Sequence, residues 1–293
     1  MNRRRSPTVR RRRLGVELRR YREAAGVTID MVAERLGCST SKISRIETGH
    51  TGATQGDVQA MLDIYRVEQG IADELVQIAR DARQKGWWHP FSTVLSSAYV
   101  GLEAEARSIR AYEQQVIPGL LQSEDYAMAL IRSARWDDTD QRNAQRVRVR
   151  MERQSLLIQD DPIDLWMVLD EAVVSRPVGG DAVMRDQLRQ LVDTARLPNV
   201  TLQILPFSVG AHAGMDGAFA ILDFPSDGDP AVVFAENAAG GLFLEKDDEL
   251  RKYVTVFDTI RDSALDPDES IDMIEMLIEE PLWKSRRRVS GSI

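Results

Sequence analysis

The side chains best suited to contact another molecule lie in the segment from Ser39 to Arg45. Ser39 is a typical N-cap residue, so a helix is expected to begin directly after it. Hydroxyl and guanidinium groups match base edges in the major groove of DNA, and an arginine engages both acceptors of guanine. The pattern predicts a base-reading helix face with Arg45 as its main residue, and a merely solvated polar face is the alternative. The candidates on this face are Thr40, Ser41, Lys42, Ser44 and Arg45.

A helix-turn-helix is expected to position that face. Thr28 can cap a helix over residues 29–36, and Gly37 can adopt the positive φ of a tight turn into the next helix. In that next helix, Ile43 and Ile46 are three residues apart and therefore share one face. Both are expected to pack against the preceding helix, which leaves the polar face free.

Three more helices are predicted around this pair, at residues 14–25, after Thr54, and at residues 71–85. The loop before Thr54 is suited to a phosphate contact through a hydroxyl and backbone amides. Residues 14–85 are therefore expected to form an all-α, five-helix DNA-binding domain. Its candidate DNA-contacting residues outside the polar helix face are Thr28, Ser39 and Thr51.

The segment YREAAGVTIDMVAERLGCSTSKISRIETG resembles the helix-turn-helix of Xre/Cro-type regulators. The resemblance implies a five-helix domain over roughly residues 12–80. It also implies a partly buried ion pair between Arg22 and Glu47, because the family pairs an arginine before the end of helix one with a glutamate after helix three and these two residues stand at the matching positions. Removing either partner would leave a buried charge uncompensated and loosen the domain. Ile29 departs from the family, in which a polar residue often contacts phosphate at the start of the second helix.

The amino-terminal 13 residues contain seven arginines and few apolar side chains. This composition predicts a disordered basic arm over residues 1–13. Such an arm can neutralise phosphates or lie in a narrow minor groove, and a solubilising tail is an equal alternative. Residues 282–293 are expected to form a second basic tail.

Charge is segregated along the chain. Residues 1–85 contain 17 Lys and Arg and 11 Asp and Glu, a net charge of +6, whereas the remainder carries −14 and brings the total to −8. A basic region favours approach to phosphate, and an acidic remainder would turn one side of the protein toward the duplex. The charges thus favour the amino-terminal part as the DNA-binding region.

The larger region, residues 86–281, alternates strand-like and helical segments. Apolar runs at residues 163–168, 200–205, 218–224 and 231–235 are expected to form one sheet. The expected fold class is α+β overall, with the all-α helix-turn-helix domain followed by a mixed α/β regulatory and interaction domain. The segments whose helical periodicity suits them to cover the sheet are residues 142–159, 183–195, 245–261 and 270–278.

The segments GLEAEARSIRAYEQQVIPGLLQSEDYA, LDEAVVSRPVG and PNVTLQILPFSVGAHAGMDGAF resemble the domain of unassigned chemistry that follows an Xre-type module in many actinobacterial regulators. The resemblance covers nearly all of residues 87–280. Because such regulators often sit beside a gene for a small BldB-type protein, and some are antitoxin-like, the resemblance implies a partner protein. It names no ligand, and a pocket for a small-molecule effector is a further expectation.

The sequence contains no recognisable catalytic or metal-binding signature. HExxH, paired CxxC, Walker A, GxGxxG and GxSxG motifs are absent, and the three histidines and single cysteine show no metal-ligand spacing. We therefore expect no enzymatic activity, no cofactor and no bound metal. His212, in a glycine-containing loop near Asp216, is the candidate for acid–base chemistry if an enzyme were present.

The sequence has no apolar run long enough to span a bilayer, and no signal-peptide core follows its first arginines. We expect a cytoplasmic transcription regulator that binds double-stranded DNA. A homodimer is expected because one small module rarely supplies enough affinity, and a dimer places two recognition helices about 34–36 Å apart. The alternative is an antitoxin-like protein that mainly sequesters a small partner and regulates its own synthesis.

Overall fold

The chain folds into two compact units. The computed structural model describes residues 7–49, 51–82, 97–134, 138–225, 231–237 and 240–285. The first unit contains helices α1 to α6, and the second contains the elements from β1 to α13. In the part of the chain that is described, no helix is both long and apolar enough to cross a membrane.

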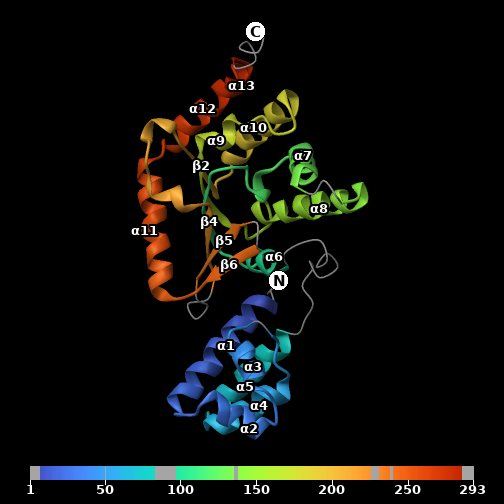
Figure 1. Cartoon of the computed structure of the whole chain (residues 1–293), viewed down its shortest axis with the longest axis vertical. Coiled ribbons are helices and arrows are strands. Elements are labelled where there is room, and N and C mark those ends of the chain that lie inside the picture. Colours follow the sequence, from blue (N-terminus) through green and yellow to red (C-terminus); the bar gives the residue numbers. More distant parts are fainter. Residues whose placement is uncertain are drawn as a thin grey trace, which may run out of the picture. The chain divides into compact units, whose positions relative to one another are not determined.

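The first unit is all-helical (Figure 1). Helix α6 groups with it through its contacts, although α6 follows the domain boundary expected near residue 86. Each of α1 to α5 contributes side chains to one core, whose most buried members are Leu18, Val32, Ile43, Val58, Met61 and Ala79. The helices are α1 Pro7–Ala24, α2 Ile29–Leu36, α3 Thr40–Glu47, α4 Gln55–Tyr65, α5 Gln69–Asp81 and α6 Ser97–Glu103.

Helix α1 begins at Pro7, so the prediction of a disordered arm is wrong for residues 7–13; residues 1–6 lie outside the described part. Arginine has a high helix propensity, which lets the helix continue through this basic run. Arg12 is only 8% exposed, and a Cβ added at Gly49 would lie 2.8 Å from its Cγ. The aliphatic stem of an arginine can thus pack like an apolar side chain. Arg10 forms an ion pair with Asp81 at 3.6 Å.

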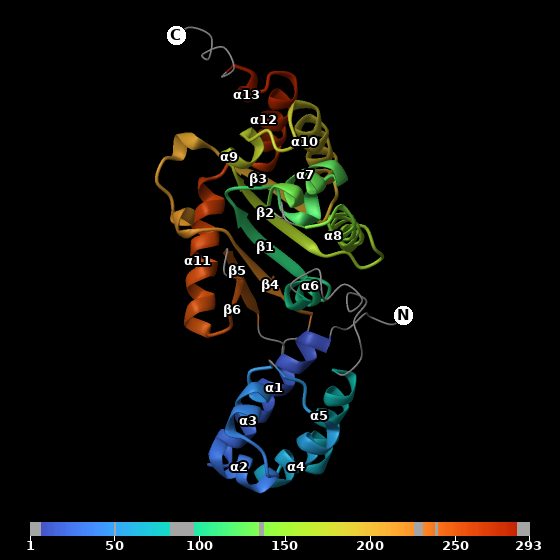
Figure 2. The ribbon, with the colours of Figure 1, turned by 45° about the vertical axis from the view of Figure 1, so that its right-hand side comes forward.

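The second unit is built on a six-stranded sheet of order β3-β2-β1-β4-β5-β6 (Figure 2). Strands β1, β2 and β3 are parallel, whereas β4, β5 and β6 are each antiparallel to the preceding neighbour in that order. Four of the strands correspond to the four predicted runs, which therefore do form one sheet. The strands are β1 Ser108–Glu113, β2 Asp164–Asp170, β3 Val200–Leu205, β4 Phe219–Asp223, β5 Val232–Asn237 and β6 Gly240–Leu244.

Helices lie on both faces of the sheet. Figures 1 and 2 show α11 on one side and α7, α8 and α10 on the other. On the α11 side, Phe257 and Ile260 are fully buried against Tyr112, Val168 and Ile221. The α-helices are α7 Glu124–Ala134, α8 Asp140–Arg153, α9 Glu171–Ser175, α10 Asp181–Ala195, α11 Asp247–Ser263, α12 Pro267–Glu279 and α13 Leu282–Ser285. Short 3-10 turns are η2 Gly119–Leu121, η3 Gln154–Leu157, η4 Phe207–Val209 and η5 Ala213–Asp216.

The predicted fold class is confirmed: a helical helix-turn-helix region precedes a mixed α/β domain. Of the predicted basic tail at residues 282–293, α13 covers the first four residues, and residues 286–293 lie outside the described part.

Candidate DNA-binding interface

Helices α2 and α3 are fixed at their starts by side-chain caps. The Thr28 hydroxyl accepts a hydrogen bond from Met31 N at 3.3 Å, and the Ser39 hydroxyl accepts one from Lys42 N at 3.2 Å. Between the helices, Gly37 has φ 62°, a left-handed conformation that favours glycine. These local interactions determine where α3 begins and how sharply the chain turns into it.

Helix α3 has one buried and one exposed face. Ile43, Ile46 and Glu47 are buried, at 0%, 2% and 6% exposed. The residues predicted to contact DNA from this helix are on the other side: Thr40, Ser41, Ser44 and Arg45 are exposed, and Lys42 is intermediate. These five side chains therefore lie on one short helix, with Arg45 about one turn beyond Thr40 and Ser41.

Lys42 differs from its neighbours because it has a partner within the domain. Its Nζ donates to Asp57 Oδ1 at 2.9 Å, and this hydrogen bond raises the pKa of Lys42. Burial alone would raise the pKa of Asp57, but hydrogen bonds from Lys42 and Thr54 outweigh burial and lower it. Asp57 also completes a capping box with Thr54 at the start of α4. Lys42 thus links α3 to α4, and the hydrogen bond to Asp57 fixes the position of its ammonium group.

The remaining candidates lie at helix ends and in the loop after α3. Thr28 and Ser39 are exposed, and their hydroxyls accept capping hydrogen bonds while their protons stay free to donate. Thr51 is intermediate in exposure, and its backbone N–H donates to Arg45 O at 3.0 Å. Because that amide is already used, a phosphate contact at Thr51 would have to come from the hydroxyl. His50 lies outside the described residues.

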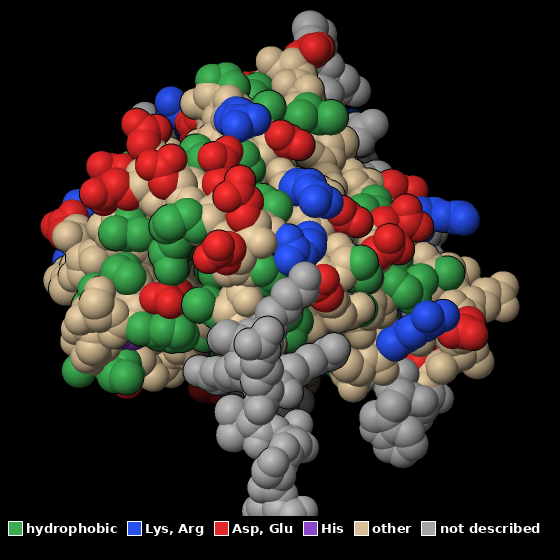
Figure 3. All heavy atoms as spheres, turned by 90° about the horizontal axis from the view of Figure 1, so that it is seen from above, with side chains coloured by type: hydrophobic (Ala, Val, Ile, Leu, Met, Phe, Trp, Pro, Cys, Tyr) green, Lys and Arg blue, Asp and Glu red, His purple; other side chains and the backbone are tan. Residues whose placement is uncertain are grey.

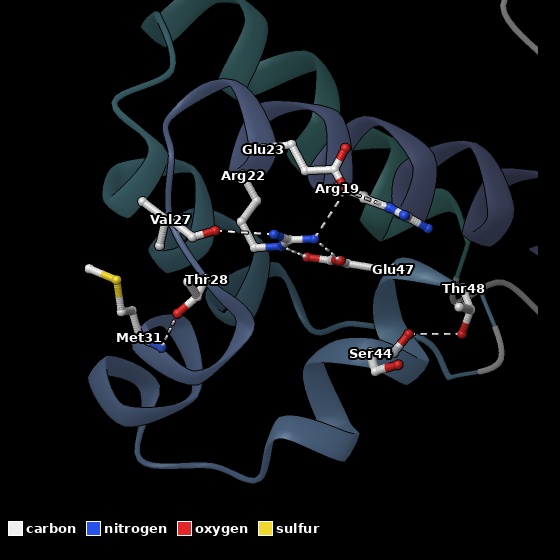
Figure 4. A network of polar contacts seen from close by, with 9 residues as sticks. All are labelled: Arg19, Arg22, Glu23, Val27, Thr28, Met31, Ser44, Glu47 and Thr48. Atoms are coloured by element: carbon white, nitrogen blue, oxygen red, sulfur yellow. Dashed lines mark hydrogen bonds and ion pairs between the residues drawn. The ribbon is translucent and has the colours of Figure 1, made fainter.

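The ion pair implied for Arg22 and Glu47 is present and is shielded from water (Figure 4). Arg22 Nε donates to Glu47 Oε1 at 2.7 Å, and Arg22 Nη2 donates to Glu47 Oε2 at 2.9 Å. The side chains are 10% and 3% exposed. Arg22 Nη1 also donates to Val27 O at 3.1 Å, and the hydrogen bond to Glu47 raises the pKa of Arg22. The guanidinium thereby ties α1, the α1–α2 connection and the end of α3 together.

Two further residues, Gly15 and Tyr65, lie near the end of α3. Gly15 packs directly on the end of that helix, since a Cβ at this position would lie 2.6 Å from Ile46 O and 2.5 Å from Glu47 O. Tyr65 is 5% exposed, and its hydroxyl has no hydrogen-bond partner among the described residues. Burial and the charge of Glu47 raise the pKa of Tyr65. The apolar spacing of the fourth helix predicted that Tyr65 is a core residue, which its burial confirms, but no sequence signal linked Gly15 or Tyr65 to α3.

His212, the acid–base candidate, lies in the second unit and has a structural environment. Its Nδ1 accepts from Gly214 N at 3.1 Å, and its ring stands edge-on to Tyr112 with centroids 5.8 Å apart. Its Nε2 is 3.9 Å from Asp170 Oδ2, to which the Tyr112 hydroxyl donates at 3.4 Å. Burial, followed by the charge of Asp170, raises the pKa of Tyr112. Asp170 also caps α9 by accepting from Ala172 N. His212 thus holds the loop after β3 against the sheet.

The surface drawn in Figure 3 carries charges of both signs. Asp and Glu side chains are spread across this face, with Lys and Arg side chains and hydrophobic groups between them. A surface that approaches a DNA backbone normally gathers basic side chains on one stripe. The face in view therefore shows no gathered stripe of basic side chains of the kind that approaches a DNA backbone.

Two parts of the chain match known protein families. Residues 13–75 match a helix-turn-helix domain, and residues 96–276 match a domain of unknown function, DUF5753. No curated protein and no solved structure was found to be similar to the chain. The first match includes all of α2, α3 and α4 and supports a DNA-binding regulator. Because the second match covers more than half of the sequence, the chain belongs to the DUF5753 family, and it joins that domain to a helix-turn-helix.

Proposed function

We propose that the chain is a sequence-specific transcription regulator of the Xre/Cro type, which places α3 in the major groove of its operator. The observation that carries this proposal is the division of α3 into a buried apolar face and an exposed face of hydroxyls and one guanidinium. Such a helix, held on a small domain with its polar side outward, has the shape and the donors that major-groove recognition requires.

Each exposed residue has a distinct role in the proposal. Arg45 is exposed, and its guanidinium engages the two acceptors of a guanine. Thr40 and Ser41, at the start of α3, contact bases or phosphates with less strict selection. Lys42, oriented by Asp57, supplies positive charge toward a phosphate. The other phosphate contacts come from Ser44, Thr28, Ser39 and Thr51.

The regulator binds as a homodimer in this proposal. One helix of eight residues reads only a few base pairs, and a genome offers many competing sites. Two copies related by a twofold axis read two half-sites one helical turn apart, which raises both affinity and selectivity.

The second unit is proposed to receive a signal rather than to catalyse a reaction. Support comes from the resemblance to actinobacterial regulators that work with a small BldB-type partner, and a small-molecule effector is the other possible input. The contacts of His212 with Gly214 and Tyr112 support a role in holding a loop. Replacing His212 with alanine should therefore leave DNA binding unchanged while lowering the stability of the second unit.

The proposal is tested by selection from a random pool of DNA duplexes with the purified full-length chain at moderate salt. Enrichment of an inverted repeat, with half-sites about one helical turn apart, is expected. The proposed function would be contradicted if the pool stayed random through repeated rounds of selection, both with the chain alone and with cellular extract added.

A further inference from the structure

Strand β6 is an open edge of the sheet in the second unit. It ends the strand order, beside β5, and pairs with β5 from Gly240 to Leu244 (Figure 2). Among the hydrogen bonds of the described residues, none joins these five residues to a segment other than β5. In an antiparallel edge strand, every second residue directs its N–H and C=O groups outward. The outer side of β6 therefore presents backbone donors and acceptors that another strand can pair with.

The opposite edge of the same sheet is partly covered by the chain itself. At β3, Ile204 N donates to the Ser270 hydroxyl at 2.9 Å, and Leu265 N donates to Ile204 O at 2.9 Å. The Gln203 side-chain amide donates to Leu265 O at 2.8 Å. The turn after α11 and the first turn of α12 thus occupy both backbone groups of Ile204 at this edge. Of the two edges, the one formed by β6 is available to a further strand.

The sequence of β6, GGLFL, contains none of the features that usually prevent edge-to-edge pairing. Lysine, other charged residues and proline protect most natural edge strands, and β6 has none of them. Leu242 is 54% exposed, and Gly240 and Gly241 are exposed beside it. On the other face of the strand, Phe243 lies against Phe234 with ring centroids 4.9 Å apart. The result is an uncharged edge with an exposed apolar side chain near its middle.

We propose that β6 forms the dimer interface of the chain, by pairing antiparallel with β6 of a second copy about a twofold axis near Leu242. The two six-stranded sheets then join into one continuous sheet. An antiparallel edge is self-complementary, because a twofold axis brings each outward N–H opposite an outward C=O. Since β6 carries no charge, like charges do not meet across the axis. The inference deepens the proposed function, which requires a twofold dimer, by naming the surface that forms it.

The first test measures the mass of the full-length chain by sedimentation over a range of protein concentrations. The wild-type chain is expected to be a dimer, and Leu242→Lys is expected to raise its dissociation constant at least about tenfold, because two like charges would then face each other across the axis. Ile158→Lys is the matched control, since Ile158 is 73% exposed and lies outside the sheet. A wild-type chain that stays monomeric at tens of micromolar overturns the proposal, and so does a dimer unaffected by Leu242→Lys.

A second test depends on proximity and not on affinity. In a Cys38→Ala background, which removes the single native cysteine, Leu242→Cys is expected to form an intermolecular disulfide under mild oxidation. Paired residues across a strand interface come close enough for this bond, whereas Ile158→Cys is expected to remain monomeric on a non-reducing gel. Equal cross-linking of the two variants would overturn the proposal. Circular dichroism confirms that each variant remains folded.

DNA selection on the same preparations separates this inference from the proposed function. A chain that cross-links through residue 242 but selects no duplex sequence refutes the proposed function and leaves the interface standing. In the opposite case, the chain is a dimer that selects an inverted repeat, but Leu242→Lys and Leu242→Cys behave like their Ile158 controls. That result refutes the β6 interface and leaves the proposed function standing.

Discussion

Arg22 and Glu47 form a buried polar contact that joins α1 to the end of α3. Their two hydrogen bonds, at 2.7 and 2.9 Å, lie where water has little access. Replacing Glu47 with alanine leaves the guanidinium buried without its counter-charge, which typically costs about 3–5 kcal/mol. We predict a loss of this size in the free energy of unfolding of the first unit, measured by urea denaturation followed by circular dichroism.

The control for that prediction removes both charges together. Arg22→Met combined with Glu47→Leu leaves no unpaired buried charge, and hydrophobic replacements of buried ion pairs are often neutral. The double variant should therefore be clearly more stable than Glu47→Ala. If the single variant proved as stable as the wild-type chain, the pair would have no part in holding α3.

The roles of residues that act on near neighbours could be predicted from the sequence. Thr28, Ser39 and Gly37 act on backbone groups within five residues, so a short window of sequence contains all that determines them. The partner of Lys42 was not predicted, because Asp57 is 15 residues away and is brought close by the packing of α4. The Thr54–Asp57 capping box was the one local signal that could have pointed to Asp57.

At the scale of elements, α1 and α3 touch where Gly15 offers no side chain. Gly15→Ala would place a methyl group 2.5 Å from Glu47 O, and the obstacle is backbone of α3 that cannot move aside freely. We expect a loss of about 1–3 kcal/mol in the free energy of unfolding of the first unit, together with weaker sequence-selective DNA binding. Thermal denaturation and fluorescence anisotropy measure the two effects.

Gly56→Ala is the matched control for Gly15→Ala. A Cβ at Gly56, within α4, would meet its nearest atom only at 3.9 Å. Alanine has the higher helix propensity, so this variant should be as stable as the wild-type chain or more stable, by up to about 1 kcal/mol. A Gly15→Ala variant that behaved in the same way would show that α1 and α3 have room to separate.

Strand β1 ends in Glu113, whose carboxyl group makes the second unit sensitive to pH. Burial, and then the nearby charge of Glu236, raises the pKa of Glu113 to about 8. The folded chain therefore keeps a proton that the unfolded chain has already released at neutral pH. Stability should fall as pH rises from the ordinary value of about 4.5 to about 8, and then level off.

Glu113→Gln is the variant that tests this pH dependence. It should remove the slope of the free energy of unfolding against pH. It should also stabilise the second unit at pH values above the raised pKa by about 1–3 kcal/mol, the usual cost of burying a polar group without its partner. Glu236→Gln, at an exposed position of β5, should leave most of the slope. Urea denaturation over a series of pH values measures it, and an unchanged slope in Glu113→Gln would assign the effect to another group.

Elements with a strong local pattern were predicted, and those defined by tertiary contacts were not. The apolar runs of β2, β3, β4 and β5 indicated strands because their side chains are buried on both faces of the sheet. Strand β1, SIRAYE, mixes charges with apolar residues, and β6 begins with two glycines, so neither had such a run. The start of α1 was placed too late because arginine stems pack against the first unit in a way that composition does not indicate.

At the scale of the whole molecule, positive charge is concentrated in residues 1–85 and negative charge in the remainder. DNA binding through the first region releases counterions from the duplex, so the logarithm of affinity should fall linearly with the logarithm of salt concentration. We expect a steep slope for the full-length chain on both specific and random duplexes. A titration series in increasing salt measures it, and affinity independent of salt would rule out binding through this basic region.

If the exposed face of α3 discriminates between base pairs, its arginine, Arg45, should carry most of the discrimination. On the duplex enriched by selection, Arg45→Ala should lose about 1–3 kcal/mol of discrimination at a single guanine position in each half-site. Arg80→Ala, which removes an equal charge from an exposed position of α5, should keep the full preference. If Arg45→Ala kept the base preference of the wild-type chain in the same fluorescence anisotropy titrations, the proposal that α3 distinguishes base pairs would be contradicted.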